Sequence, residues 1–305
     1  MLMPKKVNII EVGPRDGLQN EKTIVGIEDK VTYIKLLAAS GLKEIEATSF
    51  VRAEKIPQMS EGGELYKKLL NEAALQGTRL YCLVPNDIGL DNALDAHVGN
   101  IAIFTSTSNS FNKKNINATI DESLKRIDSV MAKAKKHNLR ARAYISTVFG
   151  CPYEGKTSLI ELKRIALHLK NLGVDEISLG DTIGVAHPLL VSEVIDSLSN
   201  DFKLDFLAMH FHDTRGMALA NIYASLQMGI TRFDSSSAGL GGCPYALGAS
   251  GNVATEDLVT LFSSMGIGCG VDLSKLAIAS KFILSKLGKP TQSKSLTAYL
   301  ANEQS

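Results

Sequence analysis

The sequence is short of the features that mark several classes of protein. It contains no tryptophan, only four cysteines in 305 residues, and a formal net charge of +1. No apolar run approaches the roughly 20 residues that a membrane-spanning helix needs. A chain this close to neutral has no global field that would draw it to nucleic acid or to a membrane surface. We therefore expect an ordinary globular protein with neither nucleic acid nor membrane as a partner.

The few cysteines are widely separated, at Cys82, Cys151, Cys243 and Cys269. Such spacing is typical of free thiols in a reducing compartment rather than of a disulfide framework, so we expect no disulfide between Cys151 and Cys243. The opening MLMPKKVNIIEVG runs at once into a strand-like pattern and leaves no room for a signal peptide. A cytoplasmic location is therefore expected.

Short β-branched runs alternate with longer amphipathic stretches along the whole chain. The runs predicted as strands are residues 7–12, 44–50, 79–84, 100–108, 141–149, 176–181, 206–213 and 232–239. Stretches such as DKVTYIKLLAASG end in glycine, where the C-cap of a helix is expected. Eight strands alternating with helices predict an α/β fold, the (β/α)₈ or TIM barrel. The alternative is a doubly wound open sheet, but no GxGxxG follows the first strand.

No linker rich in proline or serine divides the chain. We expect one domain over residues 1–305, with the barrel over about 7–265 and additional C-terminal helices over about 266–305, on the basis of typical barrel sizes.

Catalytic groups of such barrels gather at the carboxyl ends of the strands. The polar residues expected there are Arg15, Asp16, Glu46, Thr48, Ser49, Asp181, Thr182, His210, His212 and Asp213. In HFHD, His210 and His212 are two residues apart on a strand, so both side chains point to one face. With Asp16 and Asn252 as oxygen donors, this set suits Mg²⁺ or Mn²⁺ better than a sulfur-rich zinc site. The alternative is a pair of histidines that bind only backbone groups or neighbouring carboxylates.

Two further residues have alternative interpretations. The guanidinium of Arg15 can hold a carboxylate or a developing enolate oxygen through two parallel hydrogen bonds. It can equally form a structural ion pair with Glu46, and the two roles are compatible. Asp181 lies where catalytic polar groups are expected, and the alternative for Asp181 or Thr182 is a helix N-cap.

The segment AGLGGCPYALGASGN, residues 238–252, combines several glycines with one cysteine that has no CxxC partner. Glycine is costly to order, so this density needs a reason. We expect a flexible loop at the mouth of the barrel, after the eighth strand. The glycines of this loop are Gly239, Gly241, Gly242, Gly248 and Gly251.

Taken together, several motifs resemble the 3-hydroxy-3-methylglutaryl-CoA (HMG-CoA) lyase family of bacterial type. They are EVGPRDGLQNE, EATSFV, GCPYEG, EISLGDTIG, HFHDTRGMALAN and GLGGCPYALGASGNVATEDLV, in that order along the chain. The resemblance implies a TIM barrel that cleaves HMG-CoA, an acyl-CoA, to acetoacetate and acetyl-CoA with Mg²⁺ or Mn²⁺. It further implies a homodimer and a role in leucine degradation.

The resemblance also assigns roles to residues. The implied metal ligands are Asp16, His210, His212 and Asn252. Arg15 would stabilise the enolate of the departing acetyl-CoA, with Glu46 in support. Cys243 would be the catalytic acid/base on a mobile loop, whose glycines would let it open for a CoA thioester and close over it.

Other implied roles concern the substrate and the general base. Tyr144 and Thr182, with Arg15, would bind substrate. Asp181 and His210 are the two candidates for the base that deprotonates the tertiary hydroxyl group.

Different chemistry on the same barrel is the main alternative. It includes a metal-dependent aldolase, a Claisen-type condensing synthase, and a lyase for a longer 3-hydroxyglutaryl-CoA analogue. The GGCPYA loop, residues 241–246, argues against the aldolase and the synthase. A non-catalytic or carboxylase-linked barrel is disfavoured because every candidate ligand and acid/base residue is present.

Overall fold

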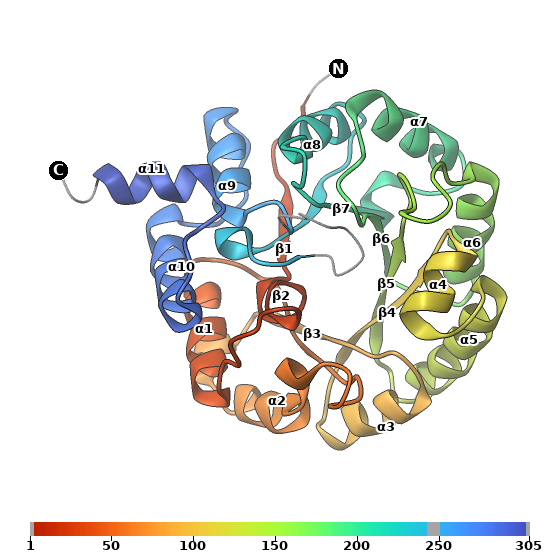
Figure 1. Ribbon diagram of the computed structural model, residues 1–305, viewed down its shortest axis with the longest axis horizontal. Coiled ribbons are helices and arrows are strands. Elements are labelled where there is room, and N and C mark those ends of the chain that lie inside the picture. Colours follow the sequence, from red (N-terminus) through yellow and green to blue (C-terminus); the bar gives the residue numbers. More distant parts are fainter. Residues whose placement is uncertain (1–2, 243–250, 303–305) are drawn as a thin grey trace.

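The computed structural model describes residues 3–242 and 251–302 (Figure 1). Eight parallel strands form a closed barrel in which each strand pairs with its neighbours in the sequence and β8 pairs with β1. The strands are β1 Asn8–Glu11, β2 Glu44–Ser49, β3 Arg79–Leu83, β4 Asn100–Ser106, β5 Arg140–Ser146, β6 Glu176–Asp181, β7 Leu207–Phe211 and β8 Arg232–Ser235. The predicted (β/α)₈ barrel is confirmed.

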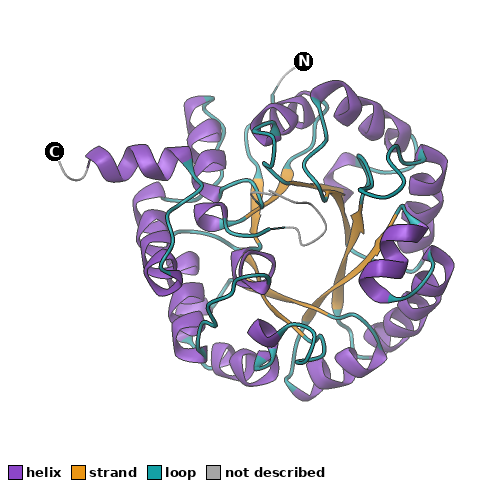
Figure 2. Cartoon of the chain, viewed as in Figure 1, coloured by secondary structure: helices purple, strands orange, loops and turns teal. Residues whose placement is uncertain are grey.

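The helices form a ring outside the strands (Figure 2). They are α1 Ile27–Ala39, α2 Gly62–Leu70, α3 Asp87–Asp95, α4 Asn109–Ile116, α5 Ile120–Lys136, α6 Leu159–Asn171, α7 Pro188–Ser199, α8 Ala218–Gln227, α9 Thr255–Ser264, α10 Leu273–Leu287 and α11 Lys294–Asn302. The additional C-terminal helices are present as α10, which packs on α1, and α11, which packs on α9. None of the helices described above is long and apolar enough to cross a membrane.

Most predicted strands extend too far at their carboxyl ends. The strand predicted over 141–149 ends at Ser146, and Thr147 then takes a φ of 59°. The strand predicted over 232–239 ends at Ser235, and Ala238 likewise has a φ of 59°. Left-handed backbone of this kind cannot continue a strand. The chain therefore leaves each strand early, and these residues belong to the segments that follow β5 and β8.

Glycines end several helices, as predicted. Gly41, Gly173 and Gly229 follow α1, α6 and α8 with φ of 106°, 76° and 93°. This left-handed backbone is where glycine replaces other residues at helix ends. At Gly41 space matters as well, because a Cβ there would lie 2.1 Å from the carbonyl oxygen of Gly270.

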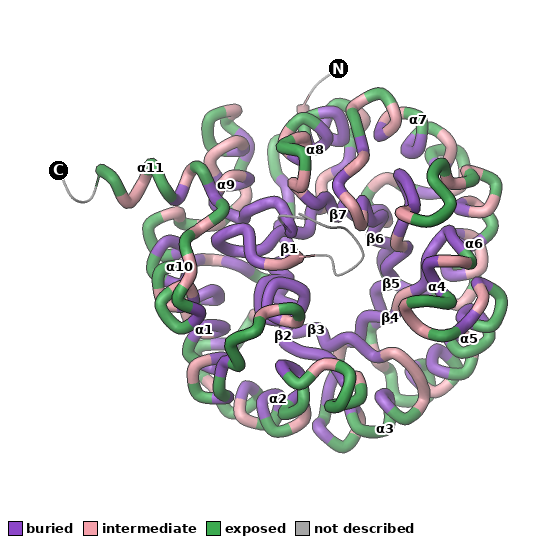
Figure 3. Tube along the Cα trace, viewed as in Figure 1, coloured by how far each residue is buried: buried purple, intermediate pink, exposed green. Residues whose placement is uncertain are grey.

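Apolar packing lies mainly between the strands and the surrounding helices, where one large cluster of buried side chains joins both layers. A second, small apolar cluster contains Leu83, Ala102 and Tyr144. Most strand residues are buried (Figure 3), and the barrel interior also holds charged side chains such as Glu46 and Arg142, at 0% and 1% exposure. Buried charges are costly unless they are paired. The interior is therefore built around ion pairs as well as around apolar contacts.

A buried carboxyl group, Glu11, links the segments that follow the carboxyl ends of β1 and β8. Its Oε1 accepts from the backbone N–H of Gly13 at 2.9 Å and of Ser237 at 2.8 Å, and its Oε2 accepts from Thr255 Oγ1 at 2.6 Å. Burial raises the pKa of Glu11 to about 8. The folded protein therefore keeps a proton on Glu11 at pH values where the unfolded chain has lost it.

Replacing Glu11 with glutamine should flatten the pH dependence of stability. An unfolded glutamate has a pKa of about 4.3, so between about pH 5 and 8 the folded state binds more protons at this site. The free energy of unfolding then falls as pH rises, by up to about 1.4 kcal/mol per pH unit. Glutamine cannot titrate, and its amide can still accept from the backbone and donate to Thr255. Urea unfolding at pH 5, 6, 7 and 8 measures the slope, and the exposed Glu64→Gln variant should leave it unchanged. Equal slopes in the wild type and Glu11→Gln would contradict the prediction.

Candidate active site

The segment GPRDG forms a single turn of π-helix, Gly13–Gly17, directly after β1. Such turns are rare and are frequent at functional sites. The turn is tightly packed, since a Cβ on Gly17 would lie 2.7 Å from Ser236 Oγ. This packing fixes Arg15 and Asp16, both buried, at the carboxyl end of the barrel.

Arg15 is held by two carboxylates. Its Nη1 donates to Asp16 Oδ1 at 2.6 Å and its Nη2 donates to Glu46 Oε2 at 2.8 Å. The guanidinium carbon also lies 5.4 Å from the centre of the Tyr144 ring. The predicted ion pair with Glu46 is confirmed. Arg15 Nε is buried and donates to none of the residues that the structure describes.

Asp16, His210 and His212 form a compact buried cluster. Each offers one ligand atom, and these atoms all lie within 4.8 Å of one another. Nδ1 of His212 is buried and has no hydrogen-bond partner in the described part of the chain. Burial, followed by the neighbouring His210, lowers the pKa of His212 to about 4. A neutral imidazole with an unpartnered nitrogen beside a carboxylate fits a divalent cation, which needs unprotonated ligands.

Asn252 lies next to this cluster and forms an antiparallel bridge with His212. Its Nδ2 donates to Asp16 Oδ2 at 2.9 Å and to the carbonyl oxygen of Leu240 at 3.1 Å. The predicted oxygen donor is thus in place, but it presents its amide nitrogen to Asp16. Sequence reasoning missed Gln19, whose Nε2 donates to Asp16 Oδ1 at 2.7 Å. Its position three residues after Asp16 in RDGLQ was the available signal.

The described glycines of the predicted loop fall into two groups. Gly239, Gly241 and Gly251 have φ of 69°, 130° and 92°. A Cβ on Gly241 would lie 2.6 Å from Asn252 Nδ2, and one on Gly251 would lie 2.6 Å from the backbone of Gly241. These two positions let the chain pass close to itself beside Asn252. A Cβ on Gly242 would meet no atom of the described residues within 4 Å.

The predicted acid/base residue, Cys243, and one predicted loop glycine, Gly248, lie outside the described residues.

Asp181 and Thr182 organise loops at the same end of the barrel. Asp181 accepts from the backbone N–H groups of Val185 at 2.9 Å and Ala186 at 3.0 Å. Thr182 Oγ1 accepts from the backbone N–H of Thr147 at 2.8 Å. Burial raises the pKa of Asp181 to about 6.

The alternative that Asp181 or Thr182 caps a helix is wrong. The N-cap of α7 is His187, whose Nδ1 accepts from the backbone N–H of Leu190 at 3.3 Å.

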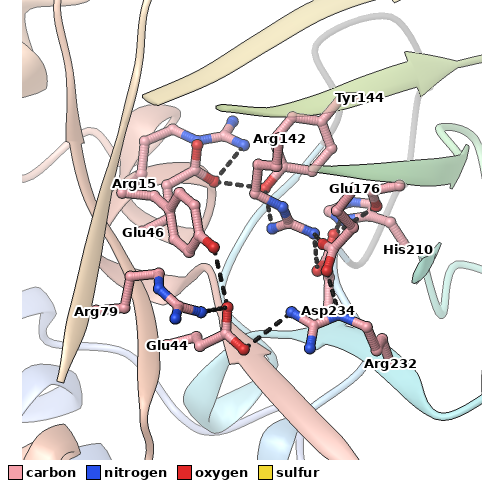
Figure 4. A network of polar contacts seen from close by, with 12 residues as sticks. Arg15, Glu44, Glu46, Arg79, Arg142, Tyr144, Glu176, His210, Arg232 and Asp234 are labelled. Atoms are coloured by element: carbon pink, nitrogen blue, oxygen red, sulfur yellow. Dashed lines mark hydrogen bonds and ion pairs between the residues drawn. The ribbon is translucent and has the colours of Figure 1, made fainter. Parts of the chain in front are cut away.

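From the cluster of Asp16, His210 and His212 toward the amino-terminal end of the barrel, a polar network crosses the barrel interior (Figure 4). Tyr144 Oη donates to Glu46 Oε2 at 2.7 Å and accepts from Arg142 Nη1 at 2.9 Å. Arg142 Nη2 lies 2.7 Å from Asp234 Oδ1 and 2.7 Å from Glu176 Oε1. Burial raises the pKa of Tyr144 well above its usual range, with Glu46 adding to the effect. Tyr144 is therefore a neutral hydrogen-bond donor that helps to hold Glu46.

The network continues to the opposite end of the barrel. Arg232 pairs with Glu176 and, at 2.9 Å, with Glu44. Glu44 also accepts from Arg79 at 3.1 Å and from Tyr81 at 3.0 Å. Paired charges thus connect the mouth of the barrel to its amino-terminal end.

Known proteins resemble the chain over nearly its whole length. A family model described as HMGL-like matches residues 6–283. The chain is 48% identical to hydroxymethylglutaryl-CoA lyase YngG of Bacillus subtilis, over 98% of this chain and 99% of that protein. Its fold is similar to the crystal structure of a Bacillus subtilis HMG-CoA lyase, with a TM-score of 0.95 and 48% identity, covering 98% of this chain and 100% of that one. It is also similar to an HMG-CoA lyase from Acinetobacter baumannii in complex with coenzyme A and 3-methylmalate, with a TM-score of 0.92 and 34% identity, covering 98% and 96% of the two chains.

Proposed function

The chain belongs to the HMGL-like family, and from this premise we infer that it is a lyase that cleaves HMG-CoA to acetoacetate and acetyl-CoA. The single observation that carries the inference is the buried cluster of Asp16, His210 and His212 beside the doubly held Arg15. In metabolism this reaction serves leucine degradation.

We propose that the cation is Mg²⁺ or Mn²⁺ and that its ligands are Asp16, His210, His212 and Asn252. Nitrogen and oxygen donors without sulfur support this choice. Asn252 would turn its amide so that Oδ1 replaces Nδ2 on the side of Asp16. When bound, the cation supplies Lewis-acid polarisation of the C3 hydroxyl oxygen of the substrate.

Arg15 is proposed to stabilise the charge that bond cleavage creates. As the C2–C3 bond breaks, acetoacetate departs and the electron pair remains as a thioester enolate. A guanidinium fixed by Glu46 needs no reorganisation to meet this charge, and its Nε, which has no acceptor among the described residues, is an additional donor. We assign Tyr144 and Thr182, with Arg15, to substrate binding. Tyr144 also holds Glu46 in place.

Two proton transfers complete the reaction. Asp181 is proposed as the base for the hydroxyl group, because a pKa of about 6 suits proton uptake near neutral pH. His210 is the second candidate. Cys243 is proposed as the acid that protonates C2, on the strength of the GGCPYA motif, with a free-thiol pKa of about 8.5.

We further propose that the substrate is an acyl-CoA, that the protein is a homodimer and that it works in the cytoplasm. Coenzyme A in the Acinetobacter baumannii relative supports the first proposal.

The direct test is to incubate the purified, reduced protein with HMG-CoA and Mg²⁺ or Mn²⁺. Acetoacetate and acetyl-CoA should appear in equal amounts, and a chelator should abolish the reaction. Absence of acetoacetate under these conditions would contradict the proposed function. Release of free CoA from acetyl-CoA and a 2-oxo acid would instead identify a condensing synthase.

Replacing His212 with alanine should weaken Mn²⁺ binding by about 100-fold or more. Loss of a residue that only hydrogen bonds to a metal ligand already lowers metal affinity by about 10–100-fold, and loss of the ligand itself should lower it at least as much. Mn²⁺ titration followed by electron paramagnetic resonance measures the affinity. His168→Ala is the matched control, because His168 pairs with Asp128 at 2.6 Å on the outer helices. An unchanged titration for His212→Ala would remove this residue from the ligand set.

A further inference from the structure

Asp234 lies directly beside His210 in the barrel wall. The two residues are partners in the register of β7 and β8. Asp234 Oδ2 is 3.2 Å from His210 Nδ1 and accepts from Ser178 Oγ at 2.7 Å. Asp234 Oδ1 accepts from Arg142 Nη2 at 2.7 Å. The side chain of Asp234 is 0% exposed, so its orientation is fixed by partners on β5, β6 and β7 and not by solvent (Figure 4).

The partners of Asp234 decide which nitrogen of His210 carries the proton. Arg142 compensates the charge of the carboxylate, and an ionised carboxylate can only accept hydrogen bonds. The proton between Asp234 and His210 must therefore sit on Nδ1 of the imidazole. Nε2 is then unprotonated and carries the lone pair that a metal ligand needs.

The ring of His210 is also held from a second side. The Tyr144 ring meets it edge to face, with ring centres 5.9 Å apart and an interplanar angle of 83°. Arg142 bonds both Tyr144 and Asp234, so one buried side chain supports both contacts. The direction in which Nε2 points is thereby fixed as well as its protonation.

We propose that Asp234 is a positioning residue that holds His210 as the Nδ1-protonated tautomer, with Nε2 directed at the metal site. The inference rests on the proposed role of His210 as a ligand. Carboxylates that orient metal-binding histidines typically change metal affinity by about 10–100-fold when they are lost. Here the carboxylate of Asp234 lies on β8 and the ligand His210 lies on β7. The negative charge of Asp234 is balanced by Arg142 inside the barrel.

The other histidine of the cluster has no such partner among the described residues. Nδ1 of His212 is buried and is not hydrogen bonded by any residue of the described chain. The two rings lie 5.3 Å apart between their centres. His212 therefore serves as an internal reference, because a change at Asp234 should alter the tautomer of His210 alone.

Asp234→Asn is the informative substitution because it keeps the shape of the side chain. The guanidinium of Arg142 can only donate hydrogen bonds, so the amide oxygen of the new side chain would face Arg142. The amide nitrogen would then face His210 and would donate to Nδ1. That contact favours the tautomer with the proton on Nε2, where it blocks metal binding. Mn²⁺ affinity should fall by about 10–100-fold. The long-range ¹H–¹⁵N spectrum of the metal-free protein should show His210 exchange its protonated nitrogen while His212 stays unchanged.

Glu176→Gln is the matched control. Glu176 is buried and pairs with the same Arg142, but no contact with His210 links it to the cluster in the residues that the structure describes. It removes a charge from the same network and should leave both Mn²⁺ affinity and the His210 tautomer as in the wild type. Equal weakening in the two variants would reduce Asp234 to general support of the network and would overturn the proposal.

The proposal can also be tested on the wild-type protein, without a variant that could fail to fold. In the metal-free protein His210 should carry its proton on Nδ1, and a proton on Nε2 would overturn the proposal. His210→Ala separates this result from the proposed function. If His210→Ala weakens Mn²⁺ binding and Asp234→Asn does not, the positioning role fails alone. If His210→Ala has no effect, the proposed metal site itself fails.

Discussion

Replacing Arg15 with glutamine is expected to lower kcat by about 10³-fold without weakening Mn²⁺ binding. Loss of a single donor to a developing oxyanion typically costs 10²–10³ in kcat, and here a full charge is lost as well. The affinity for Mn²⁺ should not fall, because Asp16 loses a positive partner 2.6 Å away that competes with the cation. Steady-state kinetics and Mn²⁺ titration of the same preparation measure the two effects.

Two further variants control this experiment. Arg15→Lys keeps the charge but not the planar fork that reaches Asp16 and Glu46 together, so an intermediate kcat is expected. Arg164→Gln removes an exposed arginine that pairs with Glu161 and Asp121 on the outer helices, and kcat should not change. A parallel loss of Mn²⁺ binding and kcat in Arg15→Gln would mean that Arg15 supports the metal site rather than the enolate.

The sequence predicted this neighbourhood because barrel geometry converts order along the chain into proximity. Asp16 follows β1 and His212 follows β7, nearly 200 residues later. Parallel strands of a closed barrel place their carboxyl ends on one rim, so the two residues had to meet there. The HxH spacing then put His210 on the same face as His212. Fold and cluster both follow from periodicity and topology.

The interior network could not be predicted in the same way. Arg142 and Asp234 occupy alternate positions in RARAYIS and RFDSSS. A charged residue at such a position normally indicates a strand face in contact with water. In this barrel the same face points inward, and the residues meet 92 positions apart in the sequence. Local patterns carry no information about which residue lies across a barrel.

The roles of individual atoms were also beyond sequence reasoning. Asn252 was predicted as an oxygen donor, yet its Nδ2 faces Asp16. Asp181 was placed at the correct rim, but its carboxylate accepts from two backbone N–H groups of the following loop. A residue type fixes which hydrogen bonds a side chain can make. The surrounding backbone decides which of them it does make.

Replacing Cys243 with serine is expected to lower kcat by about 10²–10⁴-fold, the usual contribution of a positioned general acid. A thiol with a pKa of about 8.5 gives up its proton readily near neutral pH, whereas an alcohol does not. Bond cleavage can still occur, but the enolate then returns to substrate more often than it is protonated. In D₂O the surviving turnover should therefore show a larger solvent isotope effect than the wild type.

The repeated GCPY sequence supplies the control for this variant. Cys151 has the same neighbours in sequence as Cys243, and it is buried, with its Sγ 3.0 Å from Ser108 Oγ. Cys151→Ser should keep kcat within a few-fold of the wild type, and both variants should bind Mn²⁺ normally. Weaker Mn²⁺ binding in Cys243→Ser would make this cysteine a ligand and not an acid. An equal loss of kcat in the two variants would mean that the effect of Cys243→Ser does not arise from proton transfer, because only one of the two thiols can protonate C2.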